Sequence, residues 1–404
     1  MIPKIWTDWT IAIHFLKERR TQTAMIILGV AIGVSVVVFV SALIQGLQSN
    51  IIDRTLGTQS HIRLLPSEEV NLRPVERPDQ LTLMQEVPRA QRLRSINNWQ
   101  SLEDLLDDLP ELTAVSPVVS GPAFARRGEA LESVALVGID LARYRQIIPI
   151  DESIVAGELR VDPGEALIGR GLADTLGLGL GDKLRLETGR QSTTVVDLVG
   201  IFEFGVRELD ERFVYLGLRQ TQSLLDLPGG VTVIDLTVED IFQADTIGRQ
   251  LEALTGLNAE SWMETNAQLM NALSAQSLST NIIMIFVGLS VAIGIASVLS
   301  VSVVQRTREI GILRAIGATR DQILRVFLIE GAIFGLLGAV PGIGAAYLLV
   351  WVFNTFGPRL FYIPIAGELL LLAVVLATLA GLVAAAVPSR RAARLDPVEA
   401  IRDV

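Results

Sequence analysis

Four long apolar runs constrain this chain more than any other feature of its sequence. They cover about residues 23–47, 279–304, 323–356 and 367–387. Each run is long enough to cross a hydrocarbon core of about 30 Å as an α-helix. Only 19% of the residues are charged, against about 25% in a typical soluble domain. The sequence therefore predicts a membrane protein with four transmembrane helices.

Two of these runs carry further information. The first run exceeds the apolar core of a cleavable signal peptide, and no small-residue cleavage site follows it, so we expect it to be retained. The third run is longer than one span needs, and Pro341 within it predicts a kink or a break. Tilting of this helix would absorb its excess length.

The distribution of basic residues predicts the orientation of the spans. Lysines and arginines precede the first run, lie between the second and third runs, and follow the fourth. Only Arg359 lies in the short connection between the third and fourth runs. By the positive-inside rule, both termini and the loop 305–321 are expected in the cytoplasm, and the long segment 49–275 outside.

These observations give a predicted order of segments along the chain. It consists of an interfacial helix at 1–20, spans at 21–48, 276–304 (with a stalk), 322–356 and 367–388, an outer domain at 49–275, a cytoplasmic helix at 305–321, a short outer loop at 357–366 and a cytoplasmic tail at 389–404.

The outer segment is predicted to form an α+β domain. Alternating apolar residues indicate strands at 193–204, 212–218 and 231–240, and helices are expected at 219–230 and 242–256. The stretch 166–188 is interpreted as a helix closed by glycines, a turn at Gly181–Asp182 and a strand. Residues 66–95 lack periodicity and suggest an exposed loop. Acidic residues outnumber basic ones in this domain, which argues against nucleic acid as a partner.

The N-terminal residues have the pattern of an amphipathic helix with two unlike faces. Its apolar face consists of Ile5, Trp9, Ile13 and Leu16, with Trp6 beside them. Its polar face consists of Thr7, Thr10, His14, Lys17 and Glu18. Tryptophan is enriched at membrane interfaces, so this pattern favours a helix lying on membrane lipids. The alternative is a plain cytoplasmic extension of the first span.

The sequence carries no recognisable catalytic or metal-binding motif. It has no phosphate-binding loop, so we expect no ATP binding by the chain itself, and no H-E-x-x-H or G-x-S-x-G. There is no cysteine, and the two histidines, His14 and His61, are too far apart in sequence to suggest a metal site. A non-catalytic protein without its own cofactor or metal is predicted.

Glu330 is an acidic residue well inside the third run. Intramembrane acids are costly, and a lone acid without a partner makes a poor proton relay. A structural, interhelical role is therefore favoured over ion transport. Around it, Gly331, Gly335, Gly338 and Gly342 have a spacing that allows close approach of helices.

A short cationic stretch, QRTREIGILRAIGATRDQIL, separates the second and third runs at residues 305–324. One reading is a topology signal that holds the loop in the cytoplasm. That reading leaves the apolar residues unexplained, because Ile310, Leu313 and Gly317 recur on one helical face, with Ile312 and Ile316 adjacent. A short amphipathic helix ending near Gly317 would suit a groove on a partner protein.

The same stretch carries a specific resemblance. REIGILRAIGATRDQI, the following FLIEGAIFGLLGAVPGIGAAYLL and the tail PSRRAARLDPVEAIR resemble the FtsX-like permease module of ABC transporters of the MacB/LolC/LolE type. GVAIGVSVVVFVSALIQGLQ, TLGTQSHIRLLP, VVDLVGIFEFGVRELDERFVYLGLRQTQSLL and WMETNAQLMNALSAQSLSTNIIMIF are most similar to the lipoprotein-releasing permeases. The stretch 66–95 has no counterpart in that pattern.

The resemblance implies a permease subunit in a bacterial inner membrane. It would pair with a second copy or a paralogue and with a cytoplasmic ATPase subunit, which holds ATP and Mg²⁺, and with a periplasmic carrier or adaptor. The residues implied in ATPase coupling are Arg306, Arg308, Glu309, Ile310, Leu313, Arg314 and Gly317. Ile310 and Leu313 would pack against the ATPase, Glu309 and the arginines would pair with it, and Gly317 would end the helix.

The resemblance further implies that ATP-driven motion of the outer domains extracts or exports lipoproteins. Two alternatives stay open at this point. One is efflux of amphipathic small molecules or glycolipids through a membrane-fusion adaptor, and the other is signalling to a periplasmic hydrolase or sensor.

Overall fold

The computed structural model describes residues 4–18, 20–67, 93–189, 192–358 and 361–394. The chain divides into two compact units. The first, here called the membrane unit, comprises Met1–Ile52 and Asn271–Val404. The second, the sheet unit, comprises Asp53–Met270.

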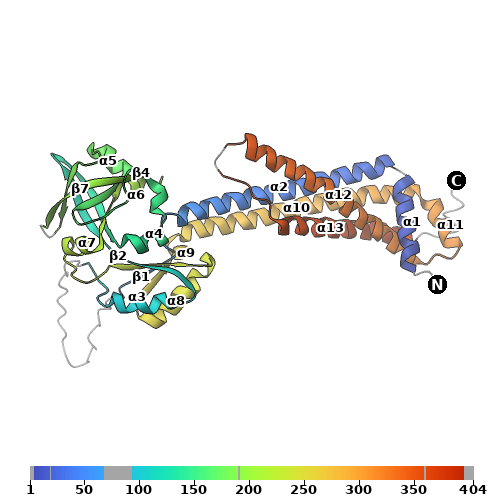
Figure 1. Cartoon of the computed structure of the whole chain (residues 1–404). Coiled ribbons are helices and arrows are strands. Elements are labelled where there is room, and N and C mark those ends of the chain that lie inside the picture. The colour runs from blue at the N-terminus through green and yellow to red at the C-terminus, as the bar shows by residue number, and fades with distance from the viewer. Residues whose placement is uncertain (1–3, 19, 68–92, 190–191, 359–360, 395–404) are drawn as a thin grey trace, which may run out of the picture. The chain divides into compact units, whose positions relative to one another are not determined.

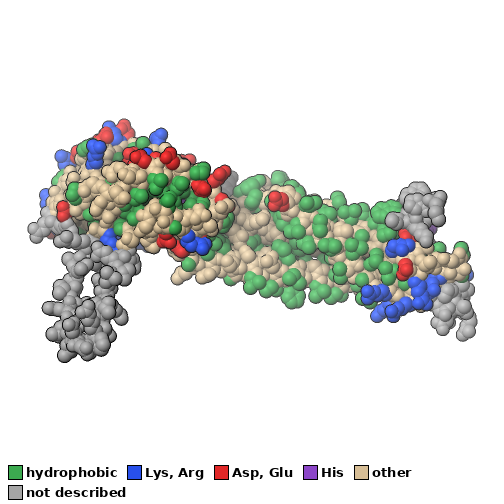
Figure 2. All heavy atoms as spheres, turned by 90° about the horizontal axis from the view of Figure 1, so that it is seen from below, with side chains coloured by type: hydrophobic (Ala, Val, Ile, Leu, Met, Phe, Trp, Pro, Cys, Tyr) green, Lys and Arg blue, Asp and Glu red, His purple; other side chains and the backbone are tan. Residues whose placement is uncertain are grey.

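The membrane unit is helical throughout its described regular structure (Figure 1). Its helices are α1 (Lys4–Glu18), α2 (Arg20–Leu56), α10 (Ala267–Gln305), α11 (Thr307–Ala315), α12 (Arg320–Phe356) and α13 (Gly367–Ala393). Four of them, α2, α10, α12 and α13, are long and apolar enough to cross a membrane. Figure 2 shows hydrophobic side chains over the bundle and basic side chains gathered at one end.

Small residues on α12 let two neighbouring helices approach its backbone. A Cβ atom added at Gly331 would collide with the carbonyl of Gly381 on α13, and one added at Gly335 with the carbonyl of Ala377. Gly338 and Gly342 instead face α2, where an added Cβ would meet Val30, Ala31 and Val34. The predicted glycine face therefore packs against two helices: Gly331 and Gly335 contact α13, and Gly338 and Gly342 contact α2.

Of the kink or break expected at Pro341, the break does not occur, and the kink stays a prediction. Helix α12 runs from Arg320 to Phe356 with Pro341 inside it. Membrane helices tolerate proline where neighbouring helices support the backbone around it. Here Gly338 and Gly342, on either side of Pro341, are both packed against α2.

In its described residues, the sheet unit is built on ten strands in one sheet. Their order is β10-β1-β9-β2-β3-β8-β5-β7-β4, with β6 pairing with β2 and β7. The strands are β1 (Ile62–Leu65), β2 (Leu112–Arg127), β3 (Ala130–Ile139), β4 (Ile154–Gly157), β5 (Glu165–Gly169), β6 (Lys183–Thr188), β7 (Thr193–Phe202), β8 (Phe213–Gly217), β9 (Val233–Val238) and β10 (Asn258–Ser261).

Seven short α-helices accompany these strands in the described part of the unit (Figure 1). They are α3 (Trp99–Asp107), α4 (Leu141–Ile147), α5 (Arg170–Leu176), α6 (Arg207–Arg212), α7 (Leu218–Leu224), α8 (Ala244–Thr255) and α9 (Trp262–Thr265). Buried aromatic side chains, among them Tyr144, Phe202 and Tyr215, join helix α4 to the sheet in one core cluster.

Most of the predicted elements of this unit are confirmed. The expected strands correspond to β7, β8 and β9, and the expected helices to α7 and α8. The helix expected to start at Ala166 is wrong, because residues 165–169 form strand β5 and the helix begins only at Arg170. Strand β5 lies between β7 and β8, and this pairing outweighs the local helical pattern. Most of the stretch 66–95 lies outside the described residues.

Candidate functional site

The cationic stretch between the second and third spans forms the short helix α11, which ends at a glycine as expected. The backbone N–H of Ala318 donates to the carbonyl of Leu313 at 3.0 Å, and that of Gly317 donates to Arg314 at 3.1 Å. This pair of bonds defines a Schellman motif, which requires a left-handed residue after the helix. Gly317 has a φ of +112°, so a glycine is needed there.

Arg306 is buried within the membrane unit, whereas the resemblance implied that it pairs with an ATPase. Its side chain and that of Glu330 are each only 3% exposed, and Arg306 Nη1 lies 3.6 Å from Glu330 Oε1. Arg306 Nη2 also donates to the carbonyl of Phe15 at 2.6 Å, and the guanidinium lies 4.5 Å from the centre of the Phe15 ring. The buried acid thus has an arginine partner, which the sequence alone did not pair with it.

The two apolar residues of α11 that were expected to pack on the ATPase differ in burial. Ile310 is fully buried in a cluster with Phe15, Val326 and Phe327 of the same unit, and Leu313 is packed partly against that cluster. Ile310 is thus enclosed within the unit, whereas Leu313 is half-buried and its contact with an ATPase stays a prediction. Their burial fixes α11 against α1 and α12.

The solvent-facing side of α11 is formed by different residues. Arg308 and Glu309 are exposed, as expected, and so is Gly317. Two isoleucines stand out on this side, since Ile312 is 42% exposed and Ile316 is 81% exposed. In the sequence, both isoleucines lie beside the face formed by Ile310 and Leu313. Only the tertiary packing shows that the isoleucines are the apolar residues that face outward.

Arg314 ties the end of α11 to the end of α13. Its Nη1 donates to the carbonyl of Ala393 at 3.4 Å. Ala393 is the last residue of α13, where helix carbonyls carry partial negative charge and favour a cation. Arg314 is therefore a half-buried link within the membrane unit, with Arg308 left as the exposed arginine of α11 itself.

Helix α1 packs on α12 through a face that matches the predicted one at Leu16 but not at Trp9. Asp8 is fully buried and pairs with Arg325 at 2.9 Å, while Ala12, Phe15 and Leu16 are buried beside it. Trp9, expected on the same face as Leu16, is 46% exposed. The Asp8–Arg325 ion pair and the contact of Arg306 with the carbonyl and ring of Phe15 hold α1 in this orientation, with Trp9 exposed.

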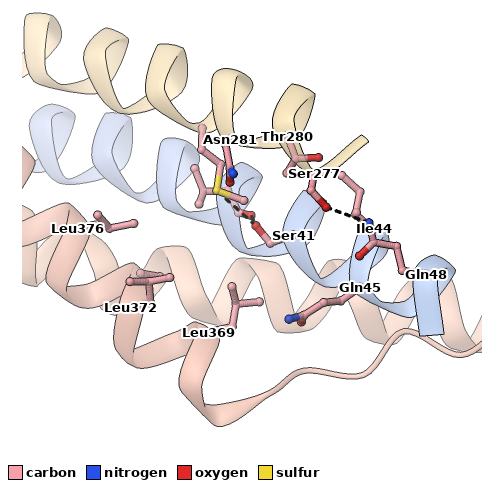
Figure 3. A pocket seen from close by; sticks show the side chains of 13 residues that line it. Ser41, Ile44, Gln45, Gln48, Ser277, Thr280, Asn281, Leu369, Leu372 and Leu376 are labelled. Carbon is pink, nitrogen blue, oxygen red and sulfur yellow. Dashed lines mark hydrogen bonds between the residues drawn. The ribbon is translucent and has the colours of Figure 1, made fainter. Parts of the chain in front are cut away.

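A cavity of about 280 Å³ lies among α2, α10 and α13, within the membrane unit (Figure 3). Leucine side chains of α13 form one wall, and Figure 3 shows Leu369, Leu372 and Leu376 in a row along that helix. Polar side chains from α2 and α10 face them. Gln48 Nε2 donates to Ser277 Oγ at 3.3 Å, which leaves the amides of Gln45 and Asn281 lining the space.

Four candidate spans, a large α/β domain inserted after the first of them and an amphipathic helix between the second and third together define a multi-pass membrane protein. The MacB-like periplasmic core domain family matches residues 23–254, and the FtsX-like permease C-terminal family matches residues 281–397. The chain belongs to the FtsX-like, MacB-type permeases of ABC transporters. The expected family and the expected fold class are confirmed.

Individual relatives show which proteins the chain is similar to. It is 26% identical to the lipoprotein-releasing system transmembrane protein LolC of Xylella fastidiosa, over 97% of this chain and 98% of that protein. It is also 26% identical to the macrolide export ATP-binding/permease protein MacB 2 of Aeromonas hydrophila, over 96% of this chain and 59% of that protein. The periplasmic region of MacB from Actinobacillus actinomycetemcomitans matches with a TM-score of 0.36 and 13% identity, over 54% of this chain and 95% of that chain.

Proposed function

We propose that this chain is a permease subunit that couples ATP hydrolysis by a partner subunit to movement of its sheet unit, and so releases lipoproteins from a bacterial inner membrane. Both chain termini and α11 lie in the cytoplasm in this proposal. ATP and Mg²⁺ bind the partner ATPase, and a second copy or a paralogue completes the transporter. Nucleotide binds one of two global states more tightly and shifts the population toward it.

The exposed side of α11 is the observation that supports coupling. Ile316 and Ile312 offer apolar side chains for a groove, and Arg308 and Glu309 offer charges of both signs that fix its orientation. The opposite side of α11 is locked to the membrane unit through Ile310 and Arg314. A movement of α11 caused by the ATPase is therefore transmitted to α12 and α13, because these contacts hold the three helices together.

The cavity among α2, α10 and α13 supports a lipidated cargo. Its leucine wall suits an acyl chain, and its amides and hydroxyls suit the ester and amide groups that join acyl chains to a protein. Its volume is just below the range of about 300–1,000 Å³ that is usual for small-molecule sites. The similarity to LolC covers nearly all of that protein, which favours the same class of cargo.

A crosslinking experiment tests the cargo assignment. A photoreactive phenylalanine analogue replaces Leu376, which lines the cavity, and in a control replaces Val383, an exposed residue of the same helix that does not line it. Cells are labelled with radioactive palmitate before irradiation. Labelled lipoproteins attached at position 376 and absent at 383 support the proposal. Equal labelling at both positions, or none at either, contradicts it.

Competition separates lipoprotein release from efflux of small amphipathic compounds. In the efflux alternative, an excess of a macrolide displaces whatever occupies the cavity and stimulates the ATPase. In lipoprotein release, the macrolide leaves crosslinking at position 376 unchanged, because acylated protein binds there in preference to it.

A second experiment tests the coupling surface. Ile316→Asp is compared with Val304→Asp. Val304 is an apolar residue of similar exposure near the end of α10, outside α11. Co-purification with the cognate ATPase is expected to be lost in Ile316→Asp and kept in Val304→Asp. Retention of the ATPase by Ile316→Asp would place the contact elsewhere.

A further inference from the structure

A second cavity, of about 490 Å³, lies within the sheet unit and is not part of the coupling surface. Its lining comes from strands β1, β2, β3, β8 and β9, from helices α4 and α6, from the ends of α2 and α9, and from the turn at residues 58–60 that precedes β1. Its volume falls in the range of about 300–1,000 Å³ that is typical of small-molecule sites. The cavity is thus large enough for a compact organic molecule.

One part of the lining is apolar. It is contributed by Val118, Val137, Ile148, Val206, Leu209 and Phe213. Tyr144 joins this wall, and its hydroxyl lies 3.2 Å from that of Tyr215 in the core. Burial raises the pKa of both tyrosines, so both phenols are neutral in the folded protein. This wall offers apolar contact without charge.

The acidic group of the lining is already occupied by a partner. Asp235 on β9 lies directly opposite Arg63 on β1, with Arg63 Nε 3.4 Å from Asp235 Oδ1. Ser60 Oγ donates to the same oxygen at 2.8 Å. Burial raises the pKa of Asp235, and Arg63 opposes that rise. The carboxylate is therefore neutralised within the protein and offers little to a cationic ligand.

The lining also contains positively charged side chains and a hydrogen-bond donor that can bind a ligand. Arg54, at the end of α2, lines the cavity with an exposed side chain, so the lining carries two arginines against one carboxylate. Gln59 adds a buried side-chain nitrogen that has no hydrogen-bond partner among the described residues. A buried donor without a partner is unfavourable, and an acceptor group in the cavity would satisfy it.

We propose that this cavity binds a small amphipathic anion. Its carboxylate, sulfate or phosphate group lies near Arg54, Arg63 and Gln59, and its apolar body lies against Val118 and Phe213. Arginine is suited to such groups because its donors form a planar fork. This inference goes beyond the proposed function, since binding to the sheet unit requires neither the ATPase nor lipoprotein cargo.

The test uses the full chain in nanodiscs without an ATPase. The probe is N-dansyl-leucine, a fluorescent anion with an apolar body, and its uncharged amide is the matched control ligand. Fluorescence is titrated against empty nanodiscs to remove lipid partitioning. Saturable binding is expected, with the anion bound about tenfold more tightly than the amide, as expected for a hydrogen bond to a charged group.

Variants locate the binding. Arg54→Gln is expected to weaken anion binding about tenfold, while Arg54→Lys keeps most of it. Ser120→Phe places a large side chain in the cavity and is expected to abolish binding. Arg185→Gln changes an exposed arginine that does not line the cavity, and leaves binding unchanged. Arg54 is exposed, so its variants test the site even if Ser120→Phe does not fold.

Competition then identifies the source of the anion. Displacement by octanoate indicates a soluble compound, and displacement only by lysophosphatidylglycerol indicates a membrane-derived one. Three results would overturn the proposal: no saturable binding beyond empty nanodiscs, equal affinity for the anion and its amide, or equal affinity in wild type and Arg54→Gln.

Discussion

Replacing Arg306 with methionine is expected to destabilise the membrane unit by about 4 kcal/mol. The arginine is buried against Glu330 at 3.6 Å, donates to the Phe15 carbonyl and covers the Phe15 ring. Removing it leaves the Glu330 carboxylate buried without its counter-charge, a change that typically costs about 3–5 kcal/mol. Glu330→Gln should cost less, about 2 kcal/mol, because Arg306 keeps both contacts with Phe15.

The double variant gives the decisive comparison. With both charges removed, Arg306→Met/Glu330→Gln should cost less than Arg306→Met alone, since no uncompensated ion is left. The expected coupling energy is about 2–3 kcal/mol. The assay is reversible unfolding in mixed micelles, followed by the fluorescence of the five tryptophans. Arg308→Met, an exposed neighbour, is the control and should stay within about 0.5 kcal/mol of wild type. Additive costs would refute the pairing.

Three further predictions concern the two units. Gly317→Ala should destabilise the end of α11 by about 1–2 kcal/mol, seen as a lower unfolding temperature, whereas Ala315→Gly should cost less. Gly335→Leu should prevent close packing of α12 on α13, and the protein should no longer elute as a monodisperse peak in size-exclusion chromatography. Gly344 has open space around it, so Gly344→Leu should still elute as a monodisperse peak. Burial lowers the pKa of His61 below its usual 6.5, so folding favours the neutral ring and stability should fall as pH drops through 6.5. His61→Gln should reduce that loss between about pH 7.5 and pH 5.5 in thermal unfolding.

The number of spans and the class of the inserted domain could be predicted from the sequence because both depend on pattern and length. Apolar runs must be about 20 residues long to cross a bilayer, and alternating residues such as those of β7 mark a half-buried strand. The role of Gly317 was predictable from the local sequence, because helices commonly end at a glycine in the left-handed conformation.

The direction of each side chain on α11 could not be predicted. Ile310 and Ile316 are the same residue type on one short helix, yet one is fully buried and the other 81% exposed. Likewise, Arg306, which lies between α10 and α11, pairs with Glu330 on α12, and a single sequence contains no signal for that contact. Strand β5 was missed because its pairing with β7 and β8 overrides a local helical pattern.

The central claim is that nucleotide binding to a partner at α11 moves the sheet unit. The chain has no cysteine, so spin labels can be placed cleanly at Leu254→Cys on α8 and Phe356→Cys on α12, both exposed positions. The measurement is the distance distribution between them by pulsed electron paramagnetic resonance, in nanodiscs with the ATPase, with and without ATP and Mg²⁺. The account predicts a shifted distribution with nucleotide, absent in Ile316→Asp. An unchanged distribution in the intact complex, under conditions where ATP is hydrolysed, would contradict it.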